Sequence, residues 1–154
     1  MSPRLFLLRC IEPGLTLLPG YMVSDAARVM LLSIAGQESN WEKRAQVNGP
    51  ARGYWQFEPA GVEAVLKQTA TIAYGLLETS NVPVTDAFAA IQYNDPLACA
   101  FARLLLWFDS SPLPAIGNAS EAFEYYVGCW RPGKPDKTRW GPAYSMACST
   151  VASK

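Results

Sequence analysis

Glu38 is the acidic residue whose position is best suited to chemistry. It lies four residues after Ile34 and seven after Leu31, and this spacing places it on the apolar face of a predicted helix. Burial on such a face disfavours the charged form and raises the pKa of the carboxyl, and the dipole at a helix C-terminus acts in the same direction. A carboxylic acid that keeps its proton near neutral pH is suited to general acid catalysis. From the pattern alone, a Glu at a frayed, solvated helix end is the alternative interpretation.

Histidine is absent from the chain, and its absence narrows the chemistry that we consider. Serine and cysteine hydrolases use an imidazole as their base, and most catalytic zinc sites use histidine ligands. Proteases, esterases and zinc amidases of those kinds are therefore disfavoured. The remaining chemistry is that of carboxylates, tyrosine, lysine or serine, and we expect neither a metal ion nor an organic cofactor.

The composition is typical of one folded domain. The 154 residues are 50% hydrophobic and 17% charged, which is ordinary for a chain with a single core. Thirteen basic and thirteen acidic residues give a formal net charge of zero, so we predict no nucleic-acid partner. Zero net charge also offers little attraction to an anionic cell wall. Binding to a polymer is expected to depend on shape, aromatic side chains and hydrogen bonds.

Cysteines and apolar segments bear on the compartment. Four cysteines occur, with no C-x-x-C pair, at Cys10, Cys99, Cys129 and Cys148. We expect free buried thiols, with one or two disulfides as the alternative in an oxidising compartment. No segment reaches the roughly 20 apolar residues of a membrane span. The apolar run 5–8 is too short for the core of a signal peptide.

Helices must position the candidate groups, because apolar residues recur at helical spacing over much of the chain. Ser24 is the predicted cap of a helix that ends near residue 38 or 39. Segment 40–58 is expected to be irregular or a short hairpin, and residues 1–23 a short helical turn or extended arm packed on the domain. The sum is a single, mainly α-helical domain over residues 1–154. Further helices are predicted over 59–68, 70–79, 84–92, 96–109 and 119–129, with a last one starting near Trp140.

The residues around Glu38 form a specific constellation. The run 36–41, Gly-Gln-Glu-Ser-Asn-Trp, is followed at 53–59 by Gly-Tyr-Trp-Gln-Phe-Glu-Pro. Counted from the Glu, the Gly lies 15 residues on, the Gln 18 and the Pro 21. This pattern resembles the signature of the soluble lytic transglycosylase family, in which a Glu-Ser pair ends a helix and a Gly-Leu-Met-Gln motif and a Pro follow. The resemblance spans about residues 17–144, and the run 130–135 is similar to a stretch in phage-encoded proteins of this type.

The resemblance implies roles for several residues. Glu38 matches the catalytic acid and base, and Ser39 matches a residue whose hydroxyl bonds near that carboxyl and the sugar. Gln56 matches the glutamine that lines the groove beside it. Tyr54 and Trp55 stand where the family has Leu-Met, an exchange that keeps the apolar bulk and adds surface for stacking.

The family's later Ala-Tyr-Asn motif has no full counterpart here. Tyr93-Asn94 is similar locally, but it precedes the predicted 96–109 helix, whereas the family's motif follows the equivalent helix. The order along the chain therefore favours Tyr125 or Tyr126 as the tyrosine of the substrate site. Packing within a helix is the alternative for either one.

A member of this family is expected to have a lysozyme-like fold with a substrate groove, and to cleave peptidoglycan glycan strands with a single carboxylate. The Glu protonates the β-1,4 glycosidic oxygen between MurNAc and GlcNAc. It then takes the proton of the same sugar's 6-hydroxyl, which closes on C1. The product carries a 1,6-anhydro-MurNAc end.

Other functions remain open. A water-using muramidase (lysozyme) on the same fold needs a second carboxylate. Glu58 is the main candidate for it, while Glu42 is expected to face solvent and Asp95 to cap a helix. A non-catalytic virion or secretion-machine protein with this fold is the second alternative. A carbohydrate-binding module would explain the aromatic residues, but not a Glu on an apolar helix face.

The expected setting is the bacterial periplasm or cell wall, which a virion-associated lysin would open locally. Because no signal peptide is recognised, we predict delivery by a bacteriophage particle or release through a pore. Other virion or tail proteins are further candidate partners. Arg44, Arg52 and Arg103 are expected to be surface charges or ion-pair partners rather than ligands for the carboxylates of stem peptides.

Overall fold

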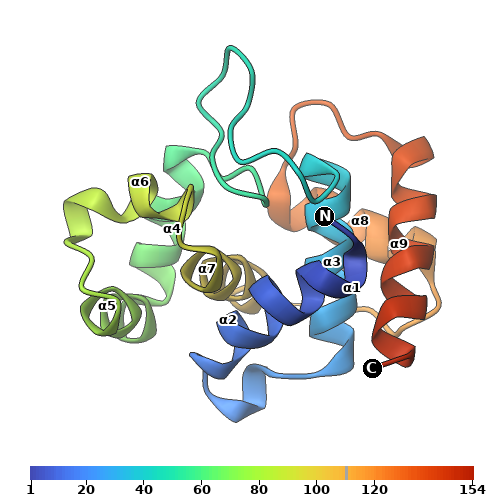
Figure 1. The fold of residues 1–154 in the computed structure, drawn as a ribbon, viewed down its shortest axis with the longest axis horizontal. Helices are drawn as coiled ribbons and strands as arrows, with labels where there is room; N and C mark the ends of the chain where they lie inside the picture. The colour runs from blue at the N-terminus through green and yellow to red at the C-terminus, as the bar shows by residue number, and fades with distance from the viewer. Residues whose placement is uncertain (110) are drawn as a thin grey trace.

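The chain folds into a mainly helical structure, as predicted (Figure 1). The computed structural model describes residues 1–109 and 111–154. In these ranges no strand is formed, and extended pairing is limited to isolated bridges from Arg52 to Ala45 and to Phe57. The elements are α1 (Pro3–Phe6), η1 (Leu7–Ile11), α2 (Glu12–Thr16), η2 (Gly20–Met22), α3 (Asp25–Ser39), α4 (Pro59–Gln68), α5 (Ala70–Thr79), η3 (Val84–Asp86), α6 (Ala87–Ile91), α7 (Asp95–Trp107), α8 (Ala119–Trp130) and α9 (Lys137–Ala152).

Helix α3 is the central element, and it begins and ends where the sequence predicts. The Ser24 hydroxyl accepts a hydrogen bond of 3.0 Å from the Ala27 amide and so caps the first turn. Asn40 adopts a left-handed conformation, with φ of 53°, and ends the helix. Helix α9 packs along α3, while α7 and the N-terminal segment cover its other side (Figure 1). The helix is therefore buried along most of its length.

The N-terminal segment differs from the prediction of a helical turn or an extended arm. Helices α1, η1 and α2 follow one another without a break and pack into the core. The π-turn η1 ends with the Glu12 amide bonded to the Leu7 carbonyl, and this wide turn accommodates the Pro13 ring that a regular helix would exclude. The side chains that this segment buries are those of Phe6, Leu7, Cys10, Ile11 and Leu15.

Gly14 explains why the N-terminal segment can lie so close to α7. A Cβ atom at this position would stand 2.4 Å from Cβ of Cys99. Only glycine permits this approach, so Gly14 is required by the packing of this segment on α7. The contact joins residues that are far apart in the sequence, and for this reason the local pattern did not reveal it.

Most predicted helix boundaries agree with the structure, with three corrections. The 84–92 segment is divided into η3 and α6. Helix α7 is capped by Asn94, whose side chain accepts from the Leu97 amide at 3.1 Å, and not by Asp95. Helix α9 starts at Lys137, ahead of the predicted Trp140, because the Asp136 carboxylate accepts from backbone amides of the first turn.

The cysteines and the hydrophobic helices can be compared with the predictions from the sequence. All four cysteines are free; Cys10 and Cys99 are buried, and Cys129 and Cys148 are half-buried. In residues 1–109 and 111–154, no helix is both long enough and apolar enough to cross a bilayer.

Candidate active site

Glu38 lies in the last turn of α3, where the helix reaches the surface. Its neighbours Gln37 and Ser39 are buried, whereas Glu38 itself is half-buried. Burial raises the pKa of its carboxyl, and the negative charge of Glu58 adds to the rise. A hydrogen bond from Tyr126 and the positive charge of Arg139 act in the opposite direction. The net result is a carboxyl that holds its proton to a higher pH than an ordinary glutamate.

Tyr126, in α8, holds this carboxyl in place. Its hydroxyl donates a hydrogen bond of 2.6 Å to Oε1 of Glu38. The tyrosine is 1% exposed, and its ring stacks on Trp140 with centroids 5.0 Å apart and an interplanar angle of 14°. Burial and the nearby Glu38 raise the pKa of Tyr126, so its hydroxyl stays protonated and can only donate to the carboxyl. The other oxygen, Oε2, has no hydrogen-bond partner among the residues that the structure describes.

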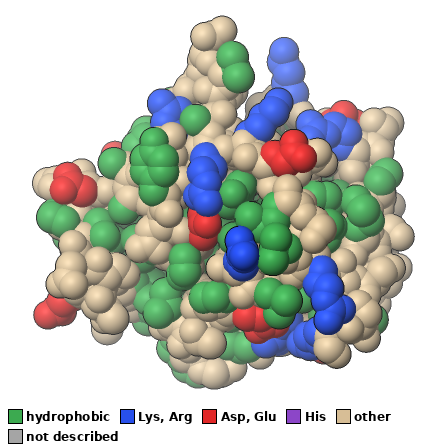
Figure 2. All heavy atoms as spheres, viewed as in Figure 1, with side chains coloured by type: hydrophobic (Ala, Val, Ile, Leu, Met, Phe, Trp, Pro, Cys, Tyr) green, Lys and Arg blue, Asp and Glu red, His purple; other side chains and the backbone are tan. Residues whose placement is uncertain are grey.

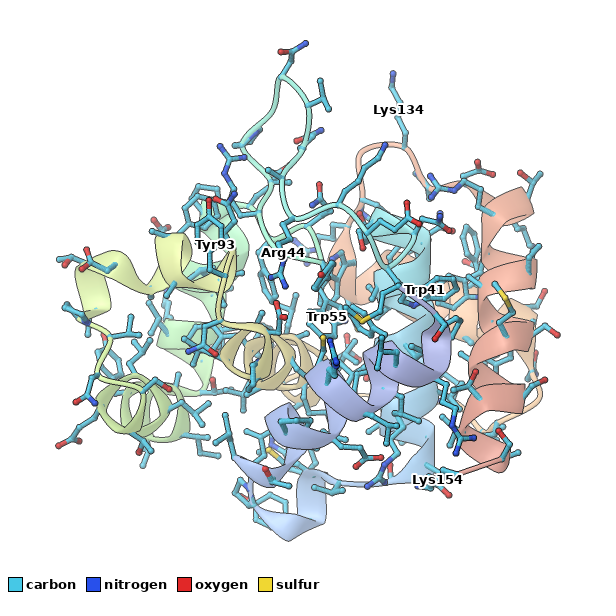
Figure 3. All side chains as sticks on the ribbon, viewed as in Figure 1. Trp41, Arg44, Trp55, Tyr93, Lys134 and Lys154 are labelled. Atoms are coloured by element: carbon cyan, nitrogen blue, oxygen red, sulfur yellow. The ribbon has the colours of Figure 1, made fainter. Side chains whose placement is uncertain are left out.

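The structure separates the two candidate tyrosines. The Tyr125 hydroxyl donates to the Leu106 carbonyl at 3.0 Å and so ties α8 to α7. Tyr93 is 73% exposed and lies on the connection between α6 and α7 (Figure 3). Of the three tyrosines considered, only Tyr126 bonds to Glu38.

Ser39 and Trp41 both fold back on α3. The Ser39 hydroxyl is buried and donates to the Ala35 carbonyl at 2.9 Å, so it is engaged by its own helix rather than by Glu38. The Trp41 indole donates to the Leu32 carbonyl at 3.0 Å. A Cβ atom on Gly36 would stand 2.4 Å from Cζ2 of this indole. In the Gly-x-Glu-Ser-x-Trp run, the chain therefore turns sharply at the end of α3 and packs the Trp41 indole back on the helix.

The Gly53–Gln56 motif is a tight turn in segment 40–58. Gly53 has φ of 74°, and a Cβ there would lie 2.7 Å from the Ile91 carbonyl oxygen, so the turn depends on glycine. Gln56 also has a positive φ, of 50°, and its amide donates to the Gly53 carbonyl at 2.8 Å. Residues Arg52 and Phe57 exchange two backbone hydrogen bonds of 2.8 Å across the turn. The Gln56 side chain is half-buried, so part of it is accessible to solvent.

Tyr54 and Trp55 point into the protein rather than toward a ligand. Tyr54 is 5% exposed, packs edge-on against Phe6, and lies beneath the Arg44 guanidinium, 4.3 Å from the ring centroid. Trp55 is fully buried and donates to the Leu31 carbonyl at 2.9 Å. The stacking surface that the sequence suggested at these positions is therefore used by the core.

The candidate second carboxylates are in three different environments. Glu58 is exposed at the start of α4, and its charge raises the pKa of Glu38. Glu42 is exposed in the turn after α3, where its amide bonds to the Ser39 carbonyl. Asp95 pairs with both terminal nitrogens of Arg44 and thereby ties segment 40–58 to α7. Among these acids, only Glu58 acts on the charge state of Glu38.

Two contacts that the sequence did not suggest hold the site together. The Trp130 indole donates to the Trp55 carbonyl at 3.0 Å and so joins the end of α8 to segment 40–58. The Gln37 amide donates to the Asp136 carbonyl at 3.1 Å and joins α3 to the connection before α9. Tyr126 and Trp130 are four residues apart, so they lie on one face of α8, the face that contacts Glu38 and segment 40–58.

Two hollows of the surface lie away from Glu38. One is lined by residues 67–72 and 107–108, between the α4–α5 junction and the end of α7. The other lies between residues 17–19 and α5. Within residues 1–109 and 111–154, no three Cys, Asp or Glu side chains are grouped as metal ligands.

No protein-family model, no curated protein and no solved structure matches the chain. The Glu38 site itself is therefore the basis for the functional proposal. That site combines a half-buried carboxyl of raised pKa, a tyrosine that donates to one of its oxygens, and a second oxygen that has no protein partner among the described residues.

Proposed function

We propose that this protein is a peptidoglycan lytic transglycosylase in which Glu38 is both the acid and the base. The observation that carries the proposal is the 2.6 Å hydrogen bond from the Tyr126 hydroxyl to Oε1 of Glu38. This bond fixes the carboxyl and leaves Oε2 to carry the catalytic proton. Burial raises the pKa of this carboxyl and so favours the protonated form, which general acid catalysis requires.

The proposed reaction needs one protein carboxyl and no water. Oε2 of Glu38 gives its proton to the glycosidic oxygen that leaves C1 of a MurNAc ring. The bond between C1 and that oxygen breaks, and the GlcNAc leaves with the proton on its new hydroxyl. The 6-hydroxyl of the same MurNAc then attacks C1 and returns its proton to Glu38. The enzyme is restored, and the strand ends in 1,6-anhydro-MurNAc.

The proposal includes a lysozyme-like domain with a substrate groove across the end of α3. Segment 40–58 and the 131–136 connection rise on either side of this end (Figure 1). The hydrogen bonds from Trp55 to the Leu31 carbonyl and from Gln37 to the Asp136 carbonyl fix these two segments relative to α3. We place the glycan strand at this end of α3 because Glu38 is only half-buried there. Half-buried Gln56 belongs to the proposed rim of the groove, whereas the buried Ser39 and Tyr54 would support it from below.

A muramidase is the second candidate function, and Glu58 is the observation that favours it. Glu58 is exposed and close enough for its charge to raise the pKa of Glu38. In a hydrolase, one carboxyl donates a proton and a second activates water or attacks the sugar. The two functions differ in the new chain end, which is an anhydro sugar in one case and a reducing sugar in the other.

The proposed setting is the bacterial cell wall, reached from a phage particle or through a pore, with virion or tail proteins as partners. A virion or secretion-machine component that uses the fold without catalysis is the competing structural role. Retention of a half-buried carboxyl of raised pKa, at a cost in stability, supports the catalytic role.

The test is the release of muropeptides from purified peptidoglycan by the wild type and by Glu38→Gln. The proposal expects anhydro-muramic ends from the wild type and none from Glu38→Gln when the products are analysed by mass spectrometry. Reducing ends would favour the muramidase and a role for Glu58. Release by neither protein, with folding shown by circular dichroism, would leave the structural role.

A further inference from the structure

Trp107, in the last turn of α7, differs from the other tryptophans of the chain. Trp41, Trp55 and Trp140 are buried and Trp130 is half-buried, and the indole N–H of each donates to a backbone carbonyl. Trp107 is 41% exposed, and its indole N–H has no acceptor among residues 1–109 and 111–154. Because tryptophan is usually well buried and its N–H usually bonded, this side chain is available to a ligand.

The Trp107 ring is supported from within the protein. The Arg103 guanidinium carbon lies 5.2 Å from the ring centroid, and the centroid of the Tyr21 ring lies 5.3 Å away. Arg103 was predicted to be a surface charge or an ion-pair partner, but it is 4% exposed and its Nε donates to the Met22 carbonyl at 2.8 Å. These contacts hold the indole in one orientation before any ligand arrives.

The hollow beside Trp107 has the size and the lining of a ligand pocket. It is lined by Trp107 and Phe108 at the end of α7 and by residues 67–72 at the α4–α5 junction, and its volume is about 490 Å³. Pockets for small ligands span about 300–1,000 Å³ and combine aromatic walls with a few polar groups that orient the ligand. Phe108 is 37% exposed, so two aromatic side chains are accessible here.

The polar side chains of this hollow are unengaged. Lys67, Gln68 and Thr71 are exposed, and they form no hydrogen bond or ion pair with any residue that the structure describes. Lys67 is the one charged residue of the lining. Lys and Arg side chains gather instead over segment 40–58 and the 131–136 connection, in the upper part of Figure 2. The hollow therefore suits a ligand that is recognised by stacking and hydrogen bonds more than by charge.

The hollow is separate from the Glu38 site. Helix α7 packs against both α3 and α5 and lies between them (Figure 1). None of the lining residues belongs to α3, α8 or segment 40–58, the elements that hold Glu38, Tyr126 and Gln56. A ligand in the hollow would therefore be bound away from the reacting carboxyl.

We propose that the hollow at Trp107 is a second saccharide-binding site, which holds a glycan strand without cutting it. The proposal rests on the proposed function, which identifies the glycan as that of peptidoglycan. The C–H face of a sugar ring packs on an aromatic ring, as Trp107 and Phe108 would provide. The hydroxyl and acetamide groups at its edge need hydrogen-bond partners, as Lys67, Gln68 and Thr71 would provide.

Two physical arguments favour a saccharide at this place. An apolar peptide segment would cover the same polar side chains and the Trp107 N–H without giving them partners, which costs free energy. A second site for the same polymer also raises the effective concentration of glycan at the first site, because both sites are on one chain.

The experiment observes the hollow directly by NMR. The probe is a β-1,4-linked tetrasaccharide of N-acetylglucosamine, titrated into Glu38→Gln labelled with a heavy nitrogen isotope. Adding Trp107→Phe in the same background identifies the Trp107 indole resonance by its absence. We expect this resonance to shift with added saccharide, because its N–H gains an acceptor.

A second variant tests the polar side of the hollow. Q68A/T71A removes two hydrogen-bonding groups at exposed positions, so the fold should be retained. The Kd read from the Trp107 resonance should rise about tenfold. The control is Tyr93→Ala, which removes another exposed aromatic side chain outside the hollow and should leave this Kd unchanged. The remaining indole resonances report that each variant is folded.

A Trp107 resonance that does not respond to the saccharide would overturn the inference, and so would an equal Kd in Q68A/T71A. A resonance that shifts with protein concentration alone would assign the hollow to a second copy of the chain and would also overturn it. Failure of the proposed function has a different signature: the wild type would release no muropeptides while the Trp107 resonance still responded. Muropeptide release without that response would contradict this inference alone.

Discussion

The Tyr126 hydroxyl donates a 2.6 Å hydrogen bond to Oε1 of Glu38, across 88 residues of sequence. It links the end of α3 to the middle of α8, and the stacking of Tyr126 on Trp140 fixes the donor. Because the bond occupies one carboxyl oxygen, it decides which oxygen is left for a substrate. It also moderates the rise in pKa that burial imposes on Glu38.

Removal of this bond in Tyr126→Phe should raise the pKa of Glu38, since the hydrogen bond favours the charged carboxylate. An acid catalyst is active when protonated, so the alkaline limb of the pH–rate profile should move to higher pH. The maximal rate should fall by about 10- to 100-fold, because the carboxyl loses its fixed orientation. The measurement is the rate of muropeptide release as a function of pH.

Tyr125→Phe is the matched control for Tyr126→Phe. Its hydroxyl bonds to the Leu106 carbonyl, so its loss should cost about 1 kcal/mol of stability and leave the pH profile in place. An alkaline limb that moves equally in both variants, or that does not move in Tyr126→Phe, would contradict the role given to Tyr126.

Glu58→Gln should shift the alkaline limb in the opposite direction. The charge of Glu58 raises the pKa of Glu38, so its removal lowers that pKa, and activity should be lost at a lower pH. A transglycosylase should keep its maximal rate within about threefold, because Glu58 has no chemical step in that mechanism. A drop of about 100-fold or more would indicate the muramidase, in which a second carboxylate is essential. Glu42→Gln, another exposed acid, is the control and should change neither quantity.

Glu38→Gln should make the protein more stable at neutral pH while abolishing activity. The folded-state pKa of Glu38 is raised, so the folded protein binds more protons than the unfolded chain between the two pKa values, and stability falls as pH rises through this window. A neutral amide avoids this loss. The melting temperature near pH 7 should therefore rise, and the gain should vanish below the unfolded pKa. A variant less stable than the wild type at neutral pH would contradict the burial of this charge.

Gly36→Ala should destabilise the end of α3 although alanine is the better helix former. The new Cβ would lie 2.4 Å from the Trp41 ring, so the indole must move and lose its bond to the Leu32 carbonyl. We expect a loss of about 1–3 kcal/mol in the free energy of unfolding, measured by denaturant titration. Gly75→Ala in α5 is the control; beyond its own stretch of helix, no described residue has an atom within 4 Å of the added Cβ, and the change should stabilise by up to about 1 kcal/mol. Equal effects at the two positions would show that the Trp41 contact is unimportant.

Local signals predicted much of the scaffold. Residues that are neighbours in the sequence determine where α3 begins and ends. They include the Ser24 cap and the apolar residues at helical spacing that lead to Glu38. The irregular 40–58 segment followed in the same way from its Gly and Pro content. Such features depend on neighbours along the chain, and this is why a single sequence reveals them.

Long-range contacts account for what the sequence left open. Residues 1–23 were expected to be a helical turn or an extended arm, but burial of this segment against α7 outweighs the low helix propensity of Pro13 and Gly14. The sequence alone did not distinguish Tyr125 from Tyr126 as the tyrosine of the site. The packing of α8 on α3 distinguishes them, because it brings the Tyr126 hydroxyl to Glu38. The net charge of zero was likewise uninformative, because its meaning depends on where the folded chain places each sign.

The most direct test of the proposed transglycosylase mechanism is cleavage of peptidoglycan in water enriched in the heavy oxygen isotope. We predict that new chain ends made by the wild type are anhydro-muramic and carry no heavy oxygen, because the 6-hydroxyl of the sugar replaces water. Glu38→Gln should make no new ends. New reducing ends labelled with heavy oxygen would contradict the transglycosylase mechanism and assign a water-using mechanism to the Glu38 site.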